Sequence, residues 1–130
     1  MEVKETIVRV IIKKNDKILL VKSVAGGYYF LPGGHSENGE TPEDAVKREL
    51  KEEASLDVSG LKLIGELKNS YNDGDVPHHE VNKIYSGEVT GTKVHTNEDH
   101  IAYEWVPFES IRKIRLLPSE IIEFVEIAVE

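Results

Sequence analysis

Three glutamates in one short segment of the sequence have the spacing of a metal site. Residues three and four apart on a helix are neighbours, so Glu49 would lie beside both Glu52 and Glu53. Adjacent carboxylates repel one another and gain nothing from a packed core, whereas hard divalent cations such as magnesium prefer oxygen ligands. The segment 33–56 therefore indicates a metal-binding helix, preceded by a glycine turn whose backbone could approach a phosphate.

The helix that must carry these acids is well specified by its own residues. Thr41 is a good N-cap and Pro42 suits the first helical position. At about 100° per residue, the side chains that recur every four positions form a buried stripe, namely Val46, Leu50 and Ala54. The three glutamates border this stripe, where partial desolvation would strengthen metal binding.

The register of the segment resembles the Nudix box. The family pattern is Gly, five residues, Glu, seven residues, Arg-Glu, an aliphatic, any residue, Glu-Glu, any residue, Gly and an aliphatic. The chain supplies this pattern with Gly34, Glu40, Arg48, Glu49, Leu50, Glu52, Glu53 and Leu56. A Glu-rich helix alone is usually a solvated face, but the glycine turn and Glu40 in register favour the Nudix interpretation.

One position departs from the family pattern. Ser55 stands where the family usually has a glycine that ends the helix, and serine tolerates a positive φ less well than glycine. We expect a modest cost in stability and no loss of chemistry.

The resemblance implies both a fold and a reaction. The expected fold is α/β, a Nudix α/β/α sandwich with a mixed β-sheet between helices, in a single Nudix domain over residues 1–130. The expected activity is metal-dependent hydrolysis of the pyrophosphate linkage in a nucleoside diphosphate joined to another moiety. The expected cofactor is Mg²⁺, for which Mn²⁺ can substitute, and it would polarise phosphoryl oxygens and lower the pKa of a bound water.

The resemblance also assigns roles to individual residues. Metal ligands would be Glu49, Glu52, Glu53 and the carbonyl of Gly33, with Glu49 as the alternative general base. Arg48 would orient Glu49 or the helix through a bidentate contact, and Glu40 would be structural. Expected substrate contacts are Gly34, His35 and Tyr29, although a surface histidine is the commoner case.

A carboxylate from outside the box often completes the site in this family. The best candidate is Glu98, in the polar loop 95–100, with Glu80 and Glu104 as alternatives. Adjacent His78 and His79 suggest a zinc site, but neighbours on a strand point to opposite faces and could not both chelate.

Composition sets further limits. The net charge of −8 argues against a nucleic-acid partner and makes bound metal essential for holding a polyanionic substrate. Cysteine is absent, so thiolate sites and disulfides are excluded. Because there is neither a long apolar run nor a signal peptide, we expect a cytoplasmic protein without a membrane partner. A homodimer is left open.

Hydrophobic patterning predicts the other elements. Strands are expected over 6–13, 17–23, 28–31, 61–69, 81–89 and 102–107, with a hairpin turn at 14–16 and a polar loop at 70–79. Helices are expected over 108–114 and 118–129.

The sequence does not determine which nucleobase the substrate carries. Tyr28, Tyr29, Tyr71 and Trp105 could stack on a base or simply pack. Family members that hydrolyse oxidised guanine triphosphates commonly have an asparagine after a proline near the last helix, where this chain has Ser119 after Pro118. ADP-ribose, dinucleotide polyphosphates, nucleotide sugars and ordinary triphosphates remain open. The alternative function is a Nudix-type sensor that binds a nucleotide without hydrolysis.

Overall fold

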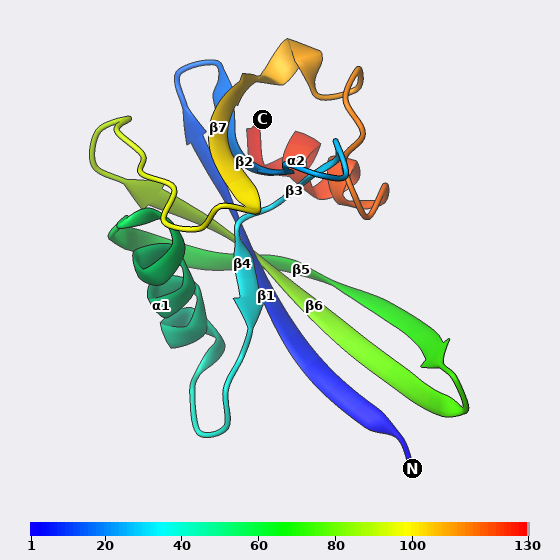
Figure 1. The fold of residues 1–130 in the computed structure, drawn as a ribbon. Helices are drawn as coiled ribbons and strands as arrows, with labels where there is room; N and C mark the ends of the chain where they lie inside the picture. The colour runs from blue at the N-terminus through cyan, green and yellow to red at the C-terminus, as the bar shows by residue number, and fades with distance from the viewer. Residues whose placement is uncertain (130) are drawn as a thin grey trace.

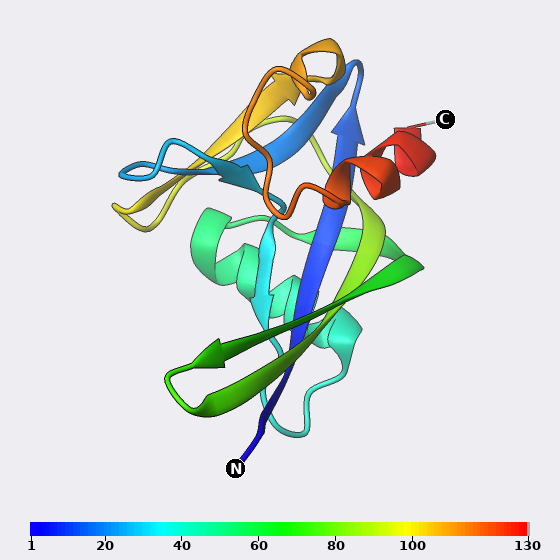
Figure 2. The same cartoon turned by 90° about the vertical axis from the view of Figure 1, so that its right-hand side faces the viewer.

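A mixed seven-stranded sheet separates two helices in the computed structural model, which describes residues 1–129 (Figures 1 and 2). The strands are β1 (Val3–Lys14), β2 (Lys17–Ser23), β3 (Tyr29–Phe30), β4 (Gly33–His35), β5 (Val58–Asp73), β6 (Val76–Val89) and β7 (Ile101–Pro107). The helices are α1 (Pro42–Ala54), the short 3₁₀ helix η1 (Phe108–Ser110) and α2 (Ile121–Val129). The main strand order is β3-β2-β1-β6-β5, with β4 paired to β1 and β7 paired to β2. The predicted α/β sandwich is confirmed.

Strand β1 links the two layers because its side chains alternate between the faces of the sheet. Val8 and Val10 belong to the core that packs against Val46 and Leu50 of α1. Ile11 belongs to a second core with Ile121 and Val125 of α2. The same strand pairs in parallel with β6 and antiparallel with β2 and β4, so it occupies the centre of the sheet.

The expected polar loop at 70–79 is wrong. Strand β5 continues to Asp73 and β6 begins at Val76, so only Gly74 and Asp75 connect them, with Gly74 at a φ of 61°. The Tyr71 and His78 rings stack across this hairpin with centroids 4.8 Å apart. Polar residues suit an antiparallel pair that faces solvent, so their abundance did not exclude strand structure here.

Three other expectations need correction. The segment 108–114 forms only η1 and turns, and α2 begins at Ile121 rather than at Pro118. The segment between η1 and α2 is hydrogen-bonded to β3: Tyr29 N–H donates to the Arg115 carbonyl, and Leu117 N–H donates to the Tyr29 carbonyl. Part of the expected glycine turn is strand β4, which pairs with residues 7–9 of β1. By contrast, the hairpin turn before Lys17 is confirmed, with Asn15 at a φ of 56°.

Within residues 1–129, no helix is long and apolar enough to cross a membrane.

Candidate active site

Arg48 connects the box helix to the loop before it. Its Nε and Nη2 donate to the two carboxylate oxygens of Glu40 at 2.7 and 3.1 Å, and Nη2 also donates to the His35 carbonyl at 3.0 Å. Glu40 in turn accepts a hydrogen bond from the Glu37 N–H at 3.0 Å. Glu40 thus fixes the loop to the box helix, and the bidentate contact of Arg48 is made to Glu40, while Glu49 receives a single hydrogen bond.

The remaining donor of Arg48 faces the predicted metal ligands. Nη1 donates to Glu49 Oε1 at 3.0 Å and to Glu52 Oε2 at 3.3 Å. The two acids differ in environment, because the Glu49 side chain is 16% exposed and that of Glu52 is 61% exposed. Burial raises the pKa of Glu49 above its usual range, and the hydrogen bond from Arg48 opposes that rise. One cation therefore keeps two neighbouring carboxylates on the same helix face.

Glu53 is held by a tyrosine that the sequence analysis did not identify. Tyr103 of β7 is 8% exposed, and its hydroxyl donates to Glu53 Oε1 at 2.6 Å. Burial raises the pKa of Glu53, the Tyr103 hydrogen bond lowers it, and the charges of Glu49 and Glu98 raise it further. Strand alternation placed Tyr103 on one face of β7, but only the tertiary structure shows that this face meets α1.

The box helix α1 ends at a left-handed Ser55, as predicted, and contacts from Asn97 support this end. Ser55 adopts the left-handed conformation at a φ of 55°, and its N–H donates to the Lys51 carbonyl. Its hydroxyl accepts a hydrogen bond from Asn97 Nδ2 at 3.1 Å, and the same amide donates to the Glu52 carbonyl at 2.9 Å. The Asn97 N–H donates to the Glu53 carbonyl at 2.9 Å. The loop 95–100 is therefore anchored to the box helix by polar contacts.

The sequence offers three carboxylates outside the box as candidates for completing the metal site. Glu98 lies in the anchored loop, and its charge raises the pKa of Glu53. This effect is smaller than those of burial, the Tyr103 hydrogen bond and the charge of Glu49. Glu104 follows Tyr103 on β7 and so points to the other face, where its Oε2 accepts the Tyr29 hydroxyl at 3.0 Å. Glu80 lies on β6 and lines a cleft beside the box. Glu98 remains the best candidate for completing the box site.

The two glycines of the box turn are required for different reasons. Gly33 has a φ of 144°, and a Cβ there would lie 1.9 Å from the Val8 carbonyl oxygen. At Gly34 a Cβ would lie 2.6–2.8 Å from the carboxylate atoms of Glu49. The glycines therefore let the turn press against β1 on one side and against the box acids on the other.

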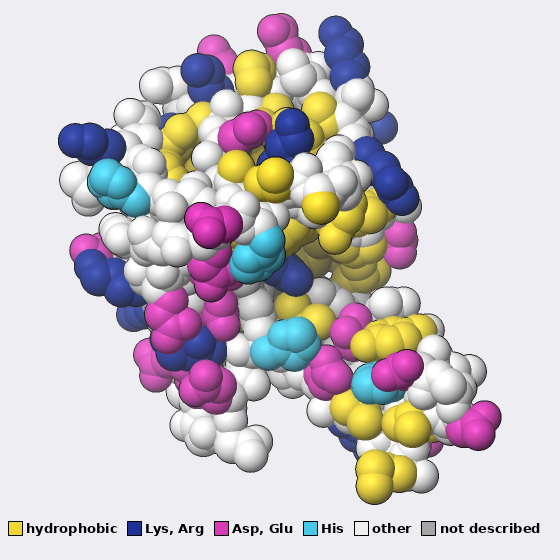
Figure 3. Space-filling view, in the orientation of Figure 1, with side chains coloured by type: hydrophobic (Ala, Val, Ile, Leu, Met, Phe, Trp, Pro, Cys, Tyr) yellow, Lys and Arg dark blue, Asp and Glu magenta, His cyan; other side chains and the backbone are white. Residues whose placement is uncertain are grey.

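A cleft of about 580 Å³ opens beside the box, a volume typical of small-molecule sites. Its walls are Ile7, Arg9, His35, Leu67, Asn69, Glu80, Asn82, Leu117, Pro118, Ser119 and Glu120. Figure 3 shows acidic and histidine side chains gathered next to this part of the surface. The cleft joins β1, β4, β5 and β6 to the segment that precedes α2.

Arg9 is the second functional candidate that the sequence analysis missed. The residue is half-buried, and the only hydrogen bond its guanidinium donates within residues 1–129 goes to the Leu31 carbonyl at 3.1 Å. Burial lowers its pKa, while the charges of Glu53, Tyr103, Glu49 and Glu80 raise it. None of the ion pairs in this part of the chain includes Arg9. A partly desolvated cation without an ion-pair partner is suited to an anionic ligand.

The predicted substrate contacts are only partly brought together. His35 lines the cleft, and Gly34 adjoins Glu49. Tyr29 does not line the cleft, because its hydroxyl is bonded to Glu104 and its ring packs with the α2 core. Ser119, singled out as the position after a proline, does line the cleft.

Comparison with known proteins gives concordant matches. The family model described as the NUDIX domain matches residues 4–126. An ADP-ribose pyrophosphatase from Methanocaldococcus jannaschii is 33% identical over 116 residues, which cover 87% of this chain and 68% of the relative. An 8-oxo-dGTP diphosphatase from Proteus vulgaris is 42% identical over 53 residues, covering 41% of this chain and 47% of the relative.

Solved structures show the same architecture. The MutT protein from Bacillus halodurans superposes with a TM-score of 0.82 at 19% identity, covering 97% of this chain and 83% of that one. At this identity the likeness concerns the fold alone.

Proposed function

The chain belongs to the Nudix hydrolase family, and we propose that it hydrolyses the pyrophosphate linkage of a nucleoside diphosphate derivative in a metal-dependent reaction. One observation carries the proposal: Arg9, which has no ion-pair partner within residues 1–129, lines a cleft and lies near enough to Glu49 and Glu53 for their charges to raise its pKa. A cation in the cleft with the box carboxylates near it suits a phosphate chain and its counterion.

The donor chemistry of the box residues suits a magnesium ion. Glu49, Glu52 and Glu53 each use one carboxylate oxygen in a hydrogen bond to Arg48 or Tyr103, and the other oxygen has no such bond within residues 1–129. These free oxygens are the hard ligands that magnesium prefers. When bound there, the ion would polarise the phosphoryl oxygens and lower the pKa of a water molecule.

The chain's own residues would keep this site in place and bind the substrate. Arg48 holds Glu49 and Glu52 while it fixes the loop through Glu40. Tyr103 of β7 holds Glu53 through its hydroxyl. Arg9 would donate to phosphate oxygens in the cleft, where guanidinium geometry matches a phosphate better than an ammonium does.

The cleft also has room for a nucleoside. Leu67, Leu117 and Pro118 give an apolar wall, and Asn69, Asn82 and Ser119 offer hydrogen-bonding groups. ADP-ribose is the first substrate to test, because the relative matched over most of this chain is named an ADP-ribose pyrophosphatase. Ser119 in place of asparagine makes an 8-oxoguanine nucleotide the weaker candidate.

A substrate screen tests the proposal. Purified protein would be incubated with ADP-ribose, 8-oxo-dGTP, dinucleotide polyphosphates, nucleotide sugars and ordinary triphosphates in the presence of Mg²⁺, and the products separated chromatographically. We expect pyrophosphate cleavage of at least one compound, loss of activity in EDTA, and recovery with Mg²⁺ or Mn²⁺. Hydrolysis that survives complete chelation would refute metal dependence.

Arg9→Gln tests the observation that carries the proposal. Loss of charged hydrogen bonds to phosphate should lower kcat/KM by about ten- to a hundredfold, the range expected for bonds to charged groups. Arg112→Gln is the matched control, since Arg112 is exposed and paired with Glu126 on α2. Equal effects of the two substitutions would show that the cleft does not bind the substrate.

A further inference from the structure

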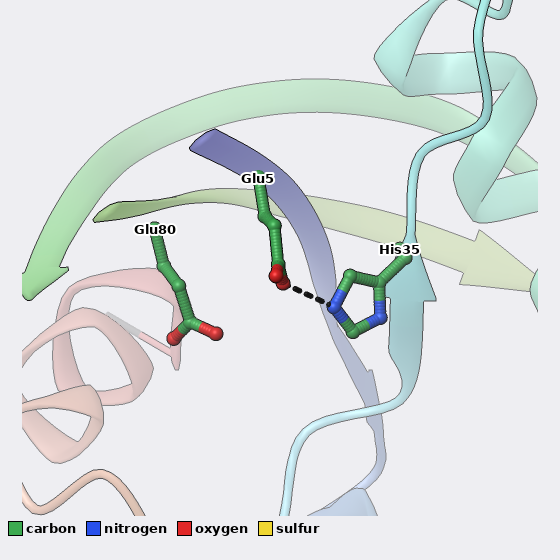
Figure 4. Close-up of side chains that lie close together, drawn as sticks. All are labelled: Glu5, His35 and Glu80. Atoms are coloured by element: carbon green, nitrogen blue, oxygen red, sulfur yellow. Dashed lines mark hydrogen bonds and ion pairs between the residues drawn. The ribbon is translucent and has the colours of Figure 1, made fainter. Parts of the chain in front are cut away.

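A second group of potential metal ligands lies on the sheet, apart from the three glutamates of the box helix. Glu5 of β1, His35 of β4 and Glu80 of β6 point toward one another (Figure 4). One ligand atom from each side chain lies within 4.8 Å of the other two, and His35 Nε2 is 2.8 Å from Glu5 Oε2. We call Glu5, His35 and Glu80 the strand triad. It is the only group of three such residues that meets this separation within residues 1–129.

Strand register places the strand triad on one face. Glu5 is directly opposite Glu80 in the parallel β1–β6 pair. His35 is opposite Ile7 in the antiparallel β1–β4 pair, and Ile7 is two residues from Glu5 and therefore on the same face. The backbone of three paired strands thus fixes the three Cα positions before any ion binds.

Neither carboxylate of the strand triad forms an ion pair with Lys or Arg in the described chain, although the Arg9 guanidinium lies near enough to interact with the charge of Glu80. Two carboxylates directly opposite on neighbouring strands repel each other. Glu5 has only His35 and His78 as ion-pair partners in the described chain, and Glu80 has no Lys or Arg partner there. Glu80 accepts only a long hydrogen bond, 3.5 Å from Asn69 Nδ2. A bound cation would remove this repulsion.

Neighbouring residues support the ligands. His78 Nδ1 lies 3.4 Å from the other oxygen of Glu5, and the His78 ring is stacked on Tyr71. The His35 carbonyl accepts a hydrogen bond from Arg48, which holds this residue from the box side. Contacts of this kind orient metal ligands and strengthen binding.

We propose that the strand triad binds a divalent transition metal, best matched by zinc. One imidazole nitrogen and two carboxylate oxygens suit zinc better than magnesium, which prefers oxygen ligands alone. Tetrahedral zinc with ligand bonds of about 2.0–2.1 Å needs its ligand atoms about 3.4 Å apart, so small side-chain rotations from the observed separation suffice. His35 and Glu80 line the cleft, so the fourth position would face it. This site differs from the box in its ligands and stands whether or not the proposed hydrolysis is found.

Zinc titration of metal-free protein tests the proposal. Zn²⁺ alone would be titrated by calorimetry into the unmodified protein and into His35→Gln, Glu80→Gln, His79→Gln and Glu53→Gln, with folding checked by circular dichroism. His79→Gln is the matched control: His79 adjoins Glu80 but points to the other face, where its Nδ1 is 3.0 Å from the Ser70 hydroxyl. Glu53→Gln reports zinc bound at the box.

We expect His35→Gln and Glu80→Gln each to weaken one equivalent of zinc binding by about tenfold or more, which is at least the loss seen for supporting residues. His79→Gln and Glu53→Gln should leave that equivalent unchanged. Co²⁺ in place of zinc should give absorption bands that disappear in His35→Gln. Zinc binding that is unaffected by both triad substitutions, or that is lost in Glu53→Gln or His79→Gln, would overturn the proposal.

Discussion

The box and the strand triad bring acids together by different routes. In the box, Glu49, Glu52 and Glu53 come from one helix, and Arg48 and Tyr103 already hold an oxygen of each. In the strand triad, the three residues come from separate strands, and Glu80 has no cationic partner in the part of the chain that is described. Here the helix supplies carboxylates alone, and other elements of the fold bind them, whereas the paired strands combine an imidazole with carboxylates.

The largest expected effect tests whether the box, and not the strand triad, is the catalytic metal site. Glu53→Gln preserves the shape of the side chain and removes a ligand charge, so kcat should fall by about a hundredfold or more. Folding should persist, because the raised pKa of Glu53 shows that its charge is disfavoured in the metal-free protein. Steady-state kinetics at saturating Mg²⁺ would measure the effect, with exposed Glu123→Gln on α2 as the control.

Near-normal turnover in both Glu53→Gln and Glu52→Gln would show that the box is not the catalytic metal site.

The next largest effect tests whether Glu98, in the anchored loop, takes part in the reaction at the box. Glu98→Gln should lower kcat by about tenfold while changing KM less, since a ligand or base acts mainly in the transition state. Glu104→Gln is the matched control because that carboxylate is bonded to Tyr29 on the other face of β7. If Glu104→Gln lost activity and Glu98→Gln did not, the assignment would move to β7.

A smaller effect concerns the helix end, where backbone strain and a side-chain bond oppose each other. Ser55→Gly relieves a left-handed conformation that disfavours serine by roughly 1 kcal/mol, but it also removes the hydroxyl that accepts from Asn97. We expect almost no change in unfolding free energy in the unmodified protein. In the Asn97→Ala background, Ser55→Gly should stabilise by about 1 kcal/mol, because only the strain remains.

Denaturant unfolding of the four proteins in this double-mutant cycle would measure the coupling. Equal effects of Ser55→Gly in both backgrounds would show that the Asn97 contact contributes nothing.

The smallest expected effect concerns pH. Tyr103→Phe removes the hydrogen bond that lowers the pKa of Glu53, so this pKa should rise further in the metal-free protein. A carboxyl whose pKa is raised in the folded state contributes stability at low pH, and this contribution is lost as pH rises through the folded pKa. The stability lost as pH rises should therefore be larger in Tyr103→Phe. NMR titration would measure the pKa of Glu53, and thermal unfolding at several pH values would measure the stability. Tyr28→Phe is the control, and identical titrations would remove Tyr103 from the site.

The sequence by itself determined the box helix and its cap. Periodicity of one helix fixes which residues are neighbours, so the buried stripe of Val46, Leu50 and Ala54 was predicted and confirmed, and Thr41 caps the helix through Asp44 N–H. The positive φ of Ser55 was also predicted, because it follows from the local pattern. The family resemblance extended this local knowledge to the fold.

Only the tertiary structure decided which distant residues join the box. Tyr103 and Asn97 contact α1, and Arg9 lies near enough for the box acids to affect its pKa; all three positions depend on strand order and on packing across the sheet. The strand triad depends on register, because a shift of one residue would turn a strand's side chains to the opposite face. Side-chain neighbours within a helix are local in sequence, whereas neighbours across a sheet are chosen by pairing, and no local pattern in this chain encodes that choice.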